Sequence, residues 1–477
     1  MAEVAETRLD EAVRGLERSS AGRLIGPGSG AYDEARTLFN SMIDKRPAVI
    51  AQCATPDDVA RALRFGRERG LQIAVRAGGH SVAGMSLCDD GLVIDVRAMK
   101  QIEVDPERRT ARVGAGCSWS ELDRAAQAHG LATTGGRVST TGIAGLTLGG
   151  GSGWLERKHG LACDNLISVE LVTADGSLLT ASKDEHPDLF WALHGGGGNF
   201  GVATALTFRL HPVGPEVLAG LLLYEAERGH DLLRLTRDFM QDAPDEFGPG
   251  VFYLTVPPEE ELPAHLHGKL VSAIALCYTG PMAEGEQLIE PFRALGPQAD
   301  LVGPVPYAEF QCSLDDPPGY RNWWTAEYLH VVTDEAIDVI HAHALKTPSP
   351  APAQSFILPW GGAVARVGEE QTPLTQRDAT WVVHPYAAWE DPADDDAVIG
   401  WARGFRDDVR RFASGGTYLN FIGDEGEDRV RAAFGEEKYQ RLAAIKAQYD
   451  PDNVFRGNQN IKPAAAIGAV EIRYLEH

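Results

Sequence analysis

Cysteine, long apolar runs and positive charge are all scarce in this chain of 477 residues. The six cysteines form no CxxC pairs, which suits free thiols in a reducing compartment better than a zinc site or a disulfide framework. No stretch approaches the ~20 apolar residues of a membrane span, and the acidic N-terminus has no apolar signal core. We therefore expect a cytoplasmic protein with no membrane partner.

The charge balance argues against a nucleic-acid partner. Lys and Arg total 44 against 68 Asp and Glu, a net charge of −24 that repels phosphate-rich molecules. The chain also lacks the HExxH, Walker-lysine and GxSxG motifs. His341 and His343 are two positions apart on a predicted helix and so face different ways, which argues against a metal site. The remaining kind of partner is a small-molecule substrate. We expect the protein to be a monomer or a homodimer.

Glycine is abundant, with 52 residues gathered around 78–91, 135–160 and 194–201. Such clusters allow close approach to the backbone. Between them, β-branched runs alternate with capped helical segments, whereas longer strands and amphipathic helices follow Gly214. This pattern predicts an α+β protein with a first region at 1–213, a second at 214–412 and a tail at 413–474. Residues 475–477 look like the remnant of a purification tag.

Short runs with turn signals at their ends predict individual strands. They are Val49–Gln52, Ile73–Arg76, Leu92–Val96, Gln101–Val104, Thr110–Val113, Ser168–Thr173, Val202–Leu210, Leu270–Tyr278, Tyr320–Leu329 and Ala379–Trp389. Thr55 followed by Pro56 predicts the start of one helix, and Ser118 with Glu121 predicts the start of another. A stripe from Val398 to Phe412 predicts a helix packed on a sheet.

Two glycine clusters are candidate ligand-binding segments. Gly78 and Gly79 precede His80 at a strand end, so main-chain amides and one imidazole face the same ligand, although a simple tight turn is the alternative. The run 140–153 is able to wrap a pyrophosphate or flat ring, and its buried apolar residues disfavour a flexible linker. Gly196-x-Gly198-x-x-Gly201 matches a dinucleotide fingerprint, but a helix precedes it and a strand follows, which argues against a Rossmann domain and NAD.

Seven motifs in order carry a family resemblance over nearly the whole chain. They are RAGGHSVAG at 76–84, GGRVSTTGIAGLTLGGGSGW at 135–154, RKHGLACDN at 157–165, LVTADG at 171–176, DLFWALHGGGGNFGV at 188–202, YLNF at 418–421 and YDPDNVFRGNQNIKP at 449–463. Together they resemble the FAD-linked oxidases of the vanillyl-alcohol oxidase, PCMH-type superfamily. More narrowly, the chain is similar to the bacterial berberine-bridge-enzyme-like group.

The resemblance implies two lobes and FAD. The segments 1–213 and 413–474 would form a PCMH-type FAD-binding domain, and 214–412 a substrate domain of antiparallel sheet backed by helices. The flavin 8α carbon would be bonded to His80. A second, cysteinyl tether of some relatives falls on Val138 here, so a single bond is implied, and Cys163 is expected to be a small buried residue.

Further residues are implied to contact the cofactor. They are Arg76, Ala77, Gly78, Gly79, Ser81, Gly84, Thr141, Gly142, Gly145, Gly149, Gly150, Gly153, Asn165, Gly201, Val202, Tyr418, Asn420, Asn458 and Asn460. A turn function is the alternative for the four residues of the tail.

The catalytic residues depart from the family pattern. Many relatives carry a catalytic tyrosine after Tyr-x-Asn, where this chain has Phe421. Alternation along the strand Ala379–Trp389 places His384 and Tyr386 on one face. We expect His384 to be the replacement base, because an imidazole accepts a proton near neutral pH, with Tyr386 and Tyr418 as further catalytic residues. A structural histidine at the domain seam is the alternative. Trp323, Trp324 and Tyr328 form either an aromatic pocket wall or ordinary packing.

The implied reaction is a two-electron oxidation. A hydride would pass from an alcohol, sugar, amine or secondary-metabolite carbon to flavin N5, and O2 would reoxidise the flavin to give H2O2. Ile143 is implied to border the space that oxygen must enter, which favours a dehydrogenase as the alternative. A non-catalytic flavin-binding protein is another alternative, and a hydrolase or metalloenzyme of an unrelated fold would be colourless.

Overall fold

The N-terminal part of the chain builds two sheets in the computed structural model, which describes residues 22–260, 262–316, 318–348 and 352–465. The acidic N-terminal segment and the predicted tag remnant lie outside the described residues. The first sheet has the order β1-β2-β4-β3, in which β1 is antiparallel and the other three are parallel. Its strands are β1 (Arg23–Ile25), β2 (Val49–Gln52), β3 (Ile73–Arg76) and β4 (Leu92–Asp95).

The crossover from β2 to β3 is the helix α3 (Pro56–Glu68), which begins where the sequence predicts. The Thr55 side chain accepts a hydrogen bond from the Asp58 amide at 3.3 Å, and the Asp58 carboxylate accepts one from the Thr55 amide at 3.0 Å. This reciprocal cap satisfies amides that the first helical turn leaves open. The crossover brings β3 beside β4, so that the turn carrying Gly78, Gly79 and His80 follows directly at the end of β3.

The second sheet is antiparallel, with the order β5-β6-β10-β8-β9. Its strands are β5 (Ile102–Asp105), β6 (Thr110–Gly114), β8 (Leu166–Val172), β9 (Leu178–Ser182) and β10 (Val202–Arg209). The connections contain α2 (Tyr32–Arg36), α4 (Trp119–Gln127), α5 (Ile143–Leu148), α6 (Glu156–His159), η1 (Ala162–Asn165), α7 (Pro187–Ala192) and η2 (Gly197–Asn199), while β7 (Leu131–Ala132) pairs with β11 (His211–Pro212). The helix before the glycines at 196–201 and the strand after them confirm the argument against a Rossmann fingerprint.

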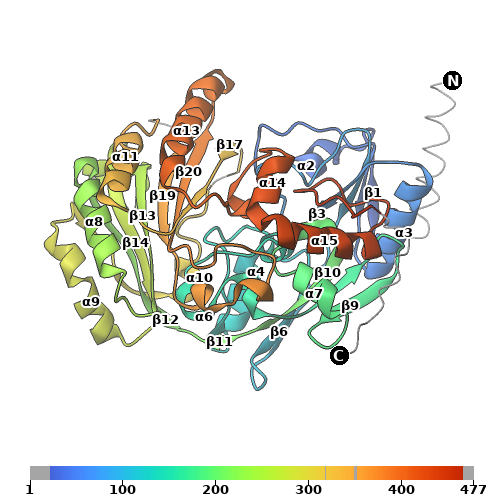
Figure 1. Ribbon diagram of the computed structural model, residues 1–477, viewed down its shortest axis with the longest axis horizontal. Coiled ribbons are helices and arrows are strands. Elements are labelled where there is room, and N and C mark those ends of the chain that lie inside the picture. The colour runs from blue at the N-terminus through green and yellow to red at the C-terminus, as the bar shows by residue number, and fades with distance from the viewer. Residues whose placement is uncertain (1–21, 261, 317, 349–351, 466–477) are drawn as a thin grey trace, which may run out of the picture.

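The second lobe is a nine-stranded antiparallel sheet with helices on one face (Figure 1). Its strands are β12 (Glu216–Glu225), β13 (Phe247–Thr255), β14 (Leu270–Tyr278), β15 (Ala299–Asp300), β16 (Gly303–Pro306), β17 (Arg321–Trp324), β18 (Glu327–Leu329), β19 (Gln354–Pro359) and β20 (Trp381–Trp389). The covering helices are α8 (Gly229–Phe239), α9 (Met282–Ala294), α11 (Asp334–Ala344) and α13 (Asp395–Val409), and short helices α10 (Tyr307–Phe310) and α12 (Ala363–Arg366) lie in connections.

Strand β20 turns alternate side chains to opposite faces. Val383 packs into the core beneath the covering helices, together with Phe405 of α13. Tyr386 and Ala388 pack on the other face against Val82 of the first lobe. The even positions of β20 therefore face the first lobe, as the period-two pattern predicts.

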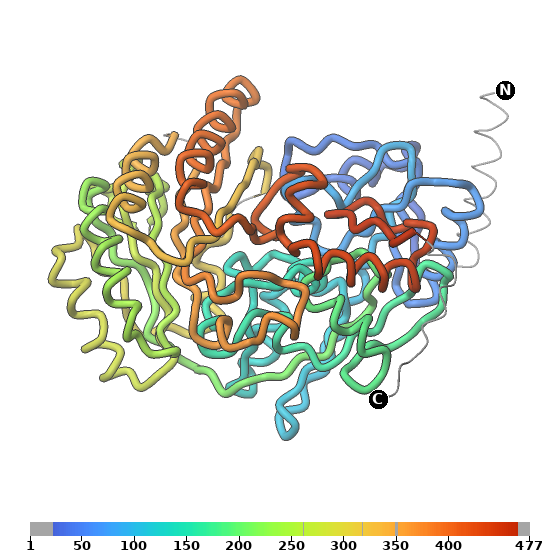
Figure 2. Tube along the Cα trace, in the orientation of Figure 1, coloured from blue at the N-terminus to red at the C-terminus, as the bar shows by residue number. Residues whose placement is uncertain are grey.

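After α13 the chain returns to the first lobe, where α14 (Glu427–Phe434) and α15 (Glu436–Tyr449) lie beside it in Figures 1 and 2. Lys446 of α15 is fully buried and forms a 3.2 Å ion pair with Asp450. Its ammonium group also donates to the Asn199 carbonyl at 3.0 Å and the Phe455 carbonyl at 2.8 Å. A buried charge needs such partners, and here they tie the tail to the glycine loop before β10.

The predicted strand Tyr320–Leu329 is in fact two strands, β17 and β18, that pair with β20 in one register. The interruption faces Pro385, which has no N–H to donate to the ladder. No helix in the described ranges is long and apolar enough to cross a membrane.

Candidate functional site

A cavity of about 340 Å³ is lined by residues of both lobes. Residues from five segments of the first lobe and the tail form one part of the wall: 77–82, 136–149, 195–201, 419–422 and 455–459. The second lobe contributes the end of the wall, which consists of Trp324, Phe356, Leu358, His384 and Tyr386. This volume is in the range of ordinary ligand cavities.

Main chain approaches main chain where two glycine segments meet. A Cβ on Gly78 would lie 2.2 Å from the Gly142 nitrogen, and a Cβ on Gly142 would lie 2.3 Å from the Gly78 nitrogen. By contrast, a Cβ on Gly145 or Gly198 would have no neighbour within 4 Å, although both residues line the cavity. The cavity therefore offers bare backbone to a ligand, which fits a flat ring and pyrophosphate held by amides.

His80 lies in the cavity wall beside these glycines. Its ring stacks on Phe39 with centroids 4.4 Å apart and planes inclined by 20°. Its Nε2 is 3.2 Å from the Thr140 hydroxyl, and its Nδ1 is 3.4 Å from the Thr141 hydroxyl. Burial lowers the pKa of His80 to about 4, so the imidazole is neutral at pH 7 and retains a nitrogen lone pair.

His384 lines the same cavity from strand β20 of the second lobe and is 1% exposed. Thr325 donates its amide to the Pro385 carbonyl at 3.5 Å, but Pro385 has no N–H for the Thr325 carbonyl. Nδ1 of His384 donates to that carbonyl instead, at 2.8 Å. A neutral imidazole carries one N–H, so Nε2 is left as the acceptor.

Aromatic rings surround this imidazole. Phe421 lies flat on His384, with centroids 4.4 Å apart and planes inclined by 6°. Phe356 and Trp324 approach at 5.5 Å and 5.9 Å in edge-on arrangements. Burial among them lowers the pKa of His384 to about 4. The sequence-based expectation of an imidazole with an ordinary pKa is therefore wrong, because it did not account for this desolvation.

Tyr386 follows His384 on the same face of β20 and lines the cavity. Its hydroxyl donates to the Asp316 carboxylate. Burial raises the pKa of Tyr386 well above its usual value, and the nearby Asp316 adds to that rise. Burial also raises the pKa of Asp316, and the charge of Asp315 acts in the same direction. The neighbouring Asp315 accepts from the Ser139 amide at 2.5 Å and thus ties this loop to the glycine-rich segment.

The tail closes the cavity from a third side. The Tyr418 hydroxyl accepts from the amides of Gly151 at 2.5 Å and Ser152 at 3.0 Å, so it supports the glycine turn from behind the wall. Asn420 lines the cavity and donates to the Leu146 carbonyl at 2.9 Å. The buried Oδ1 of Asn458, another lining residue, accepts no hydrogen bond from protein. An unpaired buried acceptor in the wall fits a donor on a bound cofactor.

The structure separates the residues implied to contact the cofactor into two groups. The cavity wall contains Ala77, Gly78, Gly79, His80, Ser81, Thr141, Gly142, Gly145, Gly149, Gly201, Asn420 and Asn458. Behind it lie Arg76, Gly84, Gly150, Gly153, Asn165, Val202, Tyr418 and Asn460.

The residues behind the wall are engaged in shaping it. The Arg76 guanidinium donates to the carbonyls of Ala35 and Thr37, and a Cβ on Gly153 would overlap the Gly135 carbonyl. Asn165 donates to the carbonyls of His159 at 3.0 Å and Leu161 at 2.9 Å. These side chains and turns hold the backbone and do not face the cavity.

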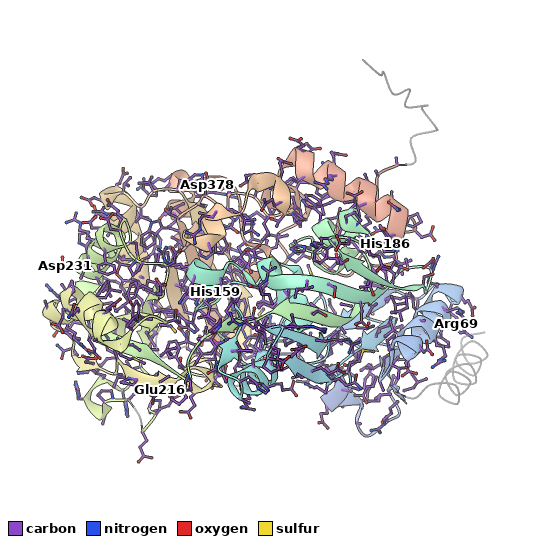
Figure 3. All side chains as sticks on the ribbon, turned by 90° about the horizontal axis from the view of Figure 1, so that it is seen from below. Arg69, His159, His186, Glu216, Asp231 and Asp378 are labelled. Carbon is purple, nitrogen blue, oxygen red and sulfur yellow. The ribbon has the colours of Figure 1, made fainter. Side chains whose placement is uncertain are left out.

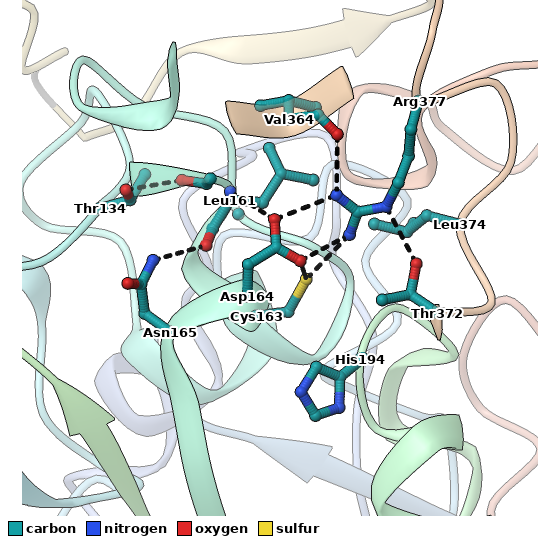
Figure 4. Close-up of polar contacts among 12 residues, drawn as sticks. Thr134, Leu161, Cys163, Asp164, Asn165, His194, Val364, Thr372, Leu374 and Arg377 are labelled. Atoms are coloured by element: carbon teal, nitrogen blue, oxygen red, sulfur yellow. Dashed lines mark hydrogen bonds and ion pairs between the residues drawn. The ribbon is translucent and has the colours of Figure 1, made fainter. Parts of the chain in front are cut away.

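Motif 157–165 also joins the two lobes. Asp164 forms a 2.7 Å ion pair with Arg377, which precedes β20 (Figure 4). The Arg377 side chain is buried, and that of Asp164 is 9% exposed. The Arg377 guanidinium also donates to the Thr372 hydroxyl at 3.0 Å. Cys163 is a free, buried thiol beside this pair, as the sequence predicts.

Several lining residues escaped the sequence analysis. Phe39 reaches the wall from a segment without a motif, and Leu419 was not singled out within the YLNF motif. Asp316 contacts Tyr386 from a loop 70 positions away in the chain. Trp324 lines the cavity, but Trp323 packs with Ala387 and Trp389 near α13. Alternation along the strand was the available signal for separating the two tryptophans.

Ile143 lies outside the cavity wall, and Tyr328 follows the packing alternative. Ile143 is fully buried in the core and is absent from the cavity wall, whereas Ala144 and Gly145 line it. The Ile143 side chain itself therefore does not narrow the cavity, and a dehydrogenase stays an alternative. Tyr328 packs against Trp360 behind the wall.

A two-lobed α+β fold with a cavity lined by glycine backbone and two imidazoles fits an FAD-dependent oxidoreductase. A family profile described as an FAD binding domain matches residues 47–182, and one described as berberine and berberine like matches 417–462.

Full-length relatives agree with these profiles. The (R)-6-hydroxynicotine oxidase of Paenarthrobacter nicotinovorans is 31% identical, with 93% of this chain and 97% of the relative covered. An uncharacterized FAD-linked oxidoreductase of Bacillus subtilis is 30% identical over the same shares. The crystal structure of 6-hydroxy-D-nicotine oxidase from Arthrobacter nicotinovorans superposes with a TM-score of 0.84 at 30% identity, covering 93% of this chain and 98% of that one.

The chain belongs to the berberine-bridge-enzyme-like family of FAD-linked oxidoreductases. The comparisons confirm the predicted family, fold class and enzyme class, and they support FAD as the cofactor.

Proposed function

We propose that the protein is an oxidase that removes a hydride from an alcohol, sugar, amine or secondary-metabolite carbon and returns the electrons to O2 as H2O2. FAD, when bound, supplies the hydride acceptor for this reaction. The proposal depends on one observation. Nε2 of His384 is left as an acceptor in the same cavity that exposes the glycine backbone and His80. A hydroxynicotine oxidase among the relatives supports an oxidation of this kind.

His80 is the proposed point of covalent attachment to the 8α carbon of the flavin. Its neutral imidazole has a lone pair for bond formation, and the adjacent hydroxyls of Thr140 and Thr141 are within reach of its two nitrogens. Val138, which lines the cavity, carries no thiol for a second bond. A covalent bond keeps the cofactor in place and makes its ring a better hydride acceptor.

His384 is the proposed general base. Because Thr325 holds Nδ1–H, the proton of a substrate hydroxyl or amine is accepted at Nε2. The rings of Phe421, Phe356 and Trp324 pack around the imidazole and fix its plane. The Tyr418 hydroxyl supports the glycine turn from behind the wall and takes no part in the proposed proton transfer, contrary to the expectation from sequence.

Anaerobic mixing of the holoenzyme with a panel of alcohols, amines and sugars tests the reaction. A substrate is expected to bleach the flavin absorbance, and His384→Ala is expected to slow this reduction by about 10²-fold or more. His129→Ala, at an exposed histidine, is the matched control and should reduce at the wild-type rate. A His384→Ala variant as fast as wild type would contradict the base, and a flavin that no substrate bleaches would contradict the reaction.

Acid precipitation of the protein tests whether the flavin is covalently bonded to His80. The precipitated polypeptide is expected to be yellow, and its peptide containing His80 to carry the mass of the flavin. His80→Ala should precipitate white. A white wild-type precipitate with an unmodified peptide contradicts covalent attachment while leaving bound FAD intact.

Reaction of the reduced enzyme with oxygen separates an oxidase from a dehydrogenase. Rapid reoxidation by O2 with one H2O2 formed per flavin is expected. Slow reoxidation by O2 but fast reoxidation by an artificial dye would favour the dehydrogenase.

A further inference from the structure

The second-lobe end of the cavity offers hydrogen-bond acceptors, because its donors are already engaged. Trp324 donates Nε1–H to Asn322 Oδ1 at 3.1 Å, and His384 donates Nδ1–H to the Thr325 carbonyl at 2.8 Å. Tyr386 donates its hydroxyl proton to Asp316. Nε2 of His384 and the lone pairs of the Tyr386 oxygen remain available. A polar ligand group that binds between them must therefore be a donor.

The charges around the cavity also favour a donor that is cationic. The carboxylate of Asp316 lies directly behind the Tyr386 hydroxyl and strengthens that oxygen as an acceptor. Among the described lining residues, Arg137 is the one with a permanent positive charge, and Glu156 pairs with it at 2.8 Å. The cavity thus has no free cation for a carboxylate ligand.

The remaining wall at this end is aromatic and apolar. Trp324 and Tyr386 have ring centroids 4.6 Å apart, and Phe356 lies 5.3 Å from Tyr386. Phe39 and Phe421 extend the same surface. Aromatic faces attract cations and pack against flat rings. A sugar would bury hydroxyl groups here without the donors and acceptors that each of them requires.

We infer that the substrate is an amine that carries an apolar ring. Its nitrogen donates to the Tyr386 oxygen and to Nε2 of His384. Asp316 acts through Tyr386 as a positioning residue that selects this charged donor. The inference rests on the proposed function, because it names the substrate class of the same cavity. It selects among the alcohols, sugars and amines that the reaction admits.

Ligands that cannot be oxidised separate binding from turnover. We would titrate the holoenzyme calorimetrically at pH 7 with 2-phenylpropan-2-amine, 2-phenylpropan-2-ol, benzoate and gluconolactone. The first two share a ring and have no hydrogen on the reacting carbon, and gluconolactone is already oxidised. The amine is expected to bind at least about tenfold more tightly than the alcohol. Benzoate and the lactone are expected not to compete with the amine for the cavity. Binding of benzoate or the lactone that is as tight as that of the amine, or tighter, would overturn the inference.

Asp316→Asn tests the role of the carboxylate, since the amide oxygen still accepts from Tyr386. The variant is expected to weaken amine binding by about tenfold and alcohol binding by less than about twofold. Asp378→Asn is the control of equal charge change, because the Asp378 carboxylate is 74% exposed at the surface (Figure 3). Equal losses for amine and alcohol would show a structural effect and contradict selection by charge.

Tyr386→Phe provides a second variant if Asp316→Asn fails to fold. It keeps the ring and removes the acceptor oxygen, so amine binding should fall while thermal unfolding stays close to wild type. Unchanged amine binding would contradict the inference. Flavin reduction by oxidisable compounds reports on the proposed function separately: bleaching by a sugar with no amine binding overturns only the inference, and amine binding without any bleaching overturns only the reaction.

Discussion

Nδ1 of His384 donates a 2.8 Å hydrogen bond to the carbonyl of Thr325, in the place of a sheet hydrogen bond that Pro385 is unable to make. The registers of β17 and β18 against β20 are continuous across this interruption. A proline within a paired strand therefore frees one carbonyl, and that carbonyl fixes the tautomer of the adjacent imidazole.

Replacing Pro385 by Ala should disturb the Nδ1 hydrogen bond of His384 without loss of flavin from the cavity. The new amide would donate to the Thr325 carbonyl and compete with Nδ1, so we expect flavin reduction to slow by about tenfold while flavin content is unchanged. Stopped-flow absorbance measures this rate. Pro249→Ala, in β13 and away from the cavity, is the matched control. A Pro385→Ala variant as fast as wild type would show that this hydrogen bond is dispensable.

The pH dependence of flavin reduction should show an unusually low acid limb. The pKa of His384 is lowered to about 4 by burial, compared with about 6.5 for an ordinary histidine. The base is neutral above this pKa and protonated below it, so activity should persist from pH 7 to about 5 and be lost as pH falls toward 4. An alcohol substrate avoids titration of the substrate itself. A limb near 6.5 would contradict a desolvated base.

Phe421→Ala should shift the acid limb of the pH profile of flavin reduction to higher pH. Phe421 covers the face of His384 at 4.4 Å, and its removal admits water that stabilises the imidazolium. We expect the limb to rise by about one pH unit. Phe412→Ala, at a ring outside the cavity wall, serves as the control. An unmoved limb would mean that Phe421 does not account for the low pKa.

Gly142→Ala should damage the cavity more than its single methyl suggests. The added carbon would lie 2.3 Å from the Gly78 nitrogen, so the two glycine segments must separate. We expect a loss of about 1–3 kcal/mol of unfolding free energy and a reduced flavin content. Gly28→Ala is the control, because a Cβ there has no neighbour within 4 Å. Denaturant unfolding and the ratio of flavin to protein absorbance measure both effects.

Removing Asp164 should destabilise the contact between the lobes. Asp164→Ala leaves the buried guanidinium of Arg377 without its ionic partner, a change that typically costs about 3–5 kcal/mol. The thermal midpoint should fall clearly. Glu436→Ala removes an ion pair at the surface with Arg431 and should leave the midpoint unchanged. Equal midpoints for both variants would show that the Asp164 pair is not needed.

Local patterns predicted much of the fold. Strands β2, β3 and β14 have the predicted limits, because Gly, Pro and Asp turn signals mark their ends. Alternation along β20 also placed His384 and Tyr386 on one face. The division of the long predicted strand opposite Pro385 was missed, because the proline that causes it lies on the partner strand.

The chemistry of the site was less predictable because it depends on contacts distant in sequence. Asp316 meets Tyr386 across 70 positions, and nothing in its local sequence distinguishes it from Asp315. The YLNF motif identified Tyr418, but only the three-dimensional contact with Gly151 shows that its hydroxyl lies behind the wall. The low pKa of His384 likewise arises from rings on four separate segments.

The final wall of the cavity comes from residues 419–422 and 455–459, and Lys446 anchors the glycine loop to this same stretch. A ribosome makes these residues after both sheets of the first lobe and the sheet of the second. A nascent chain that has already completed its first lobe still lacks one side of the pocket and the buried ammonium that holds the loop. Capture of the cofactor must therefore wait until this stretch has been made, and polypeptides cut short before α15 would be released without it.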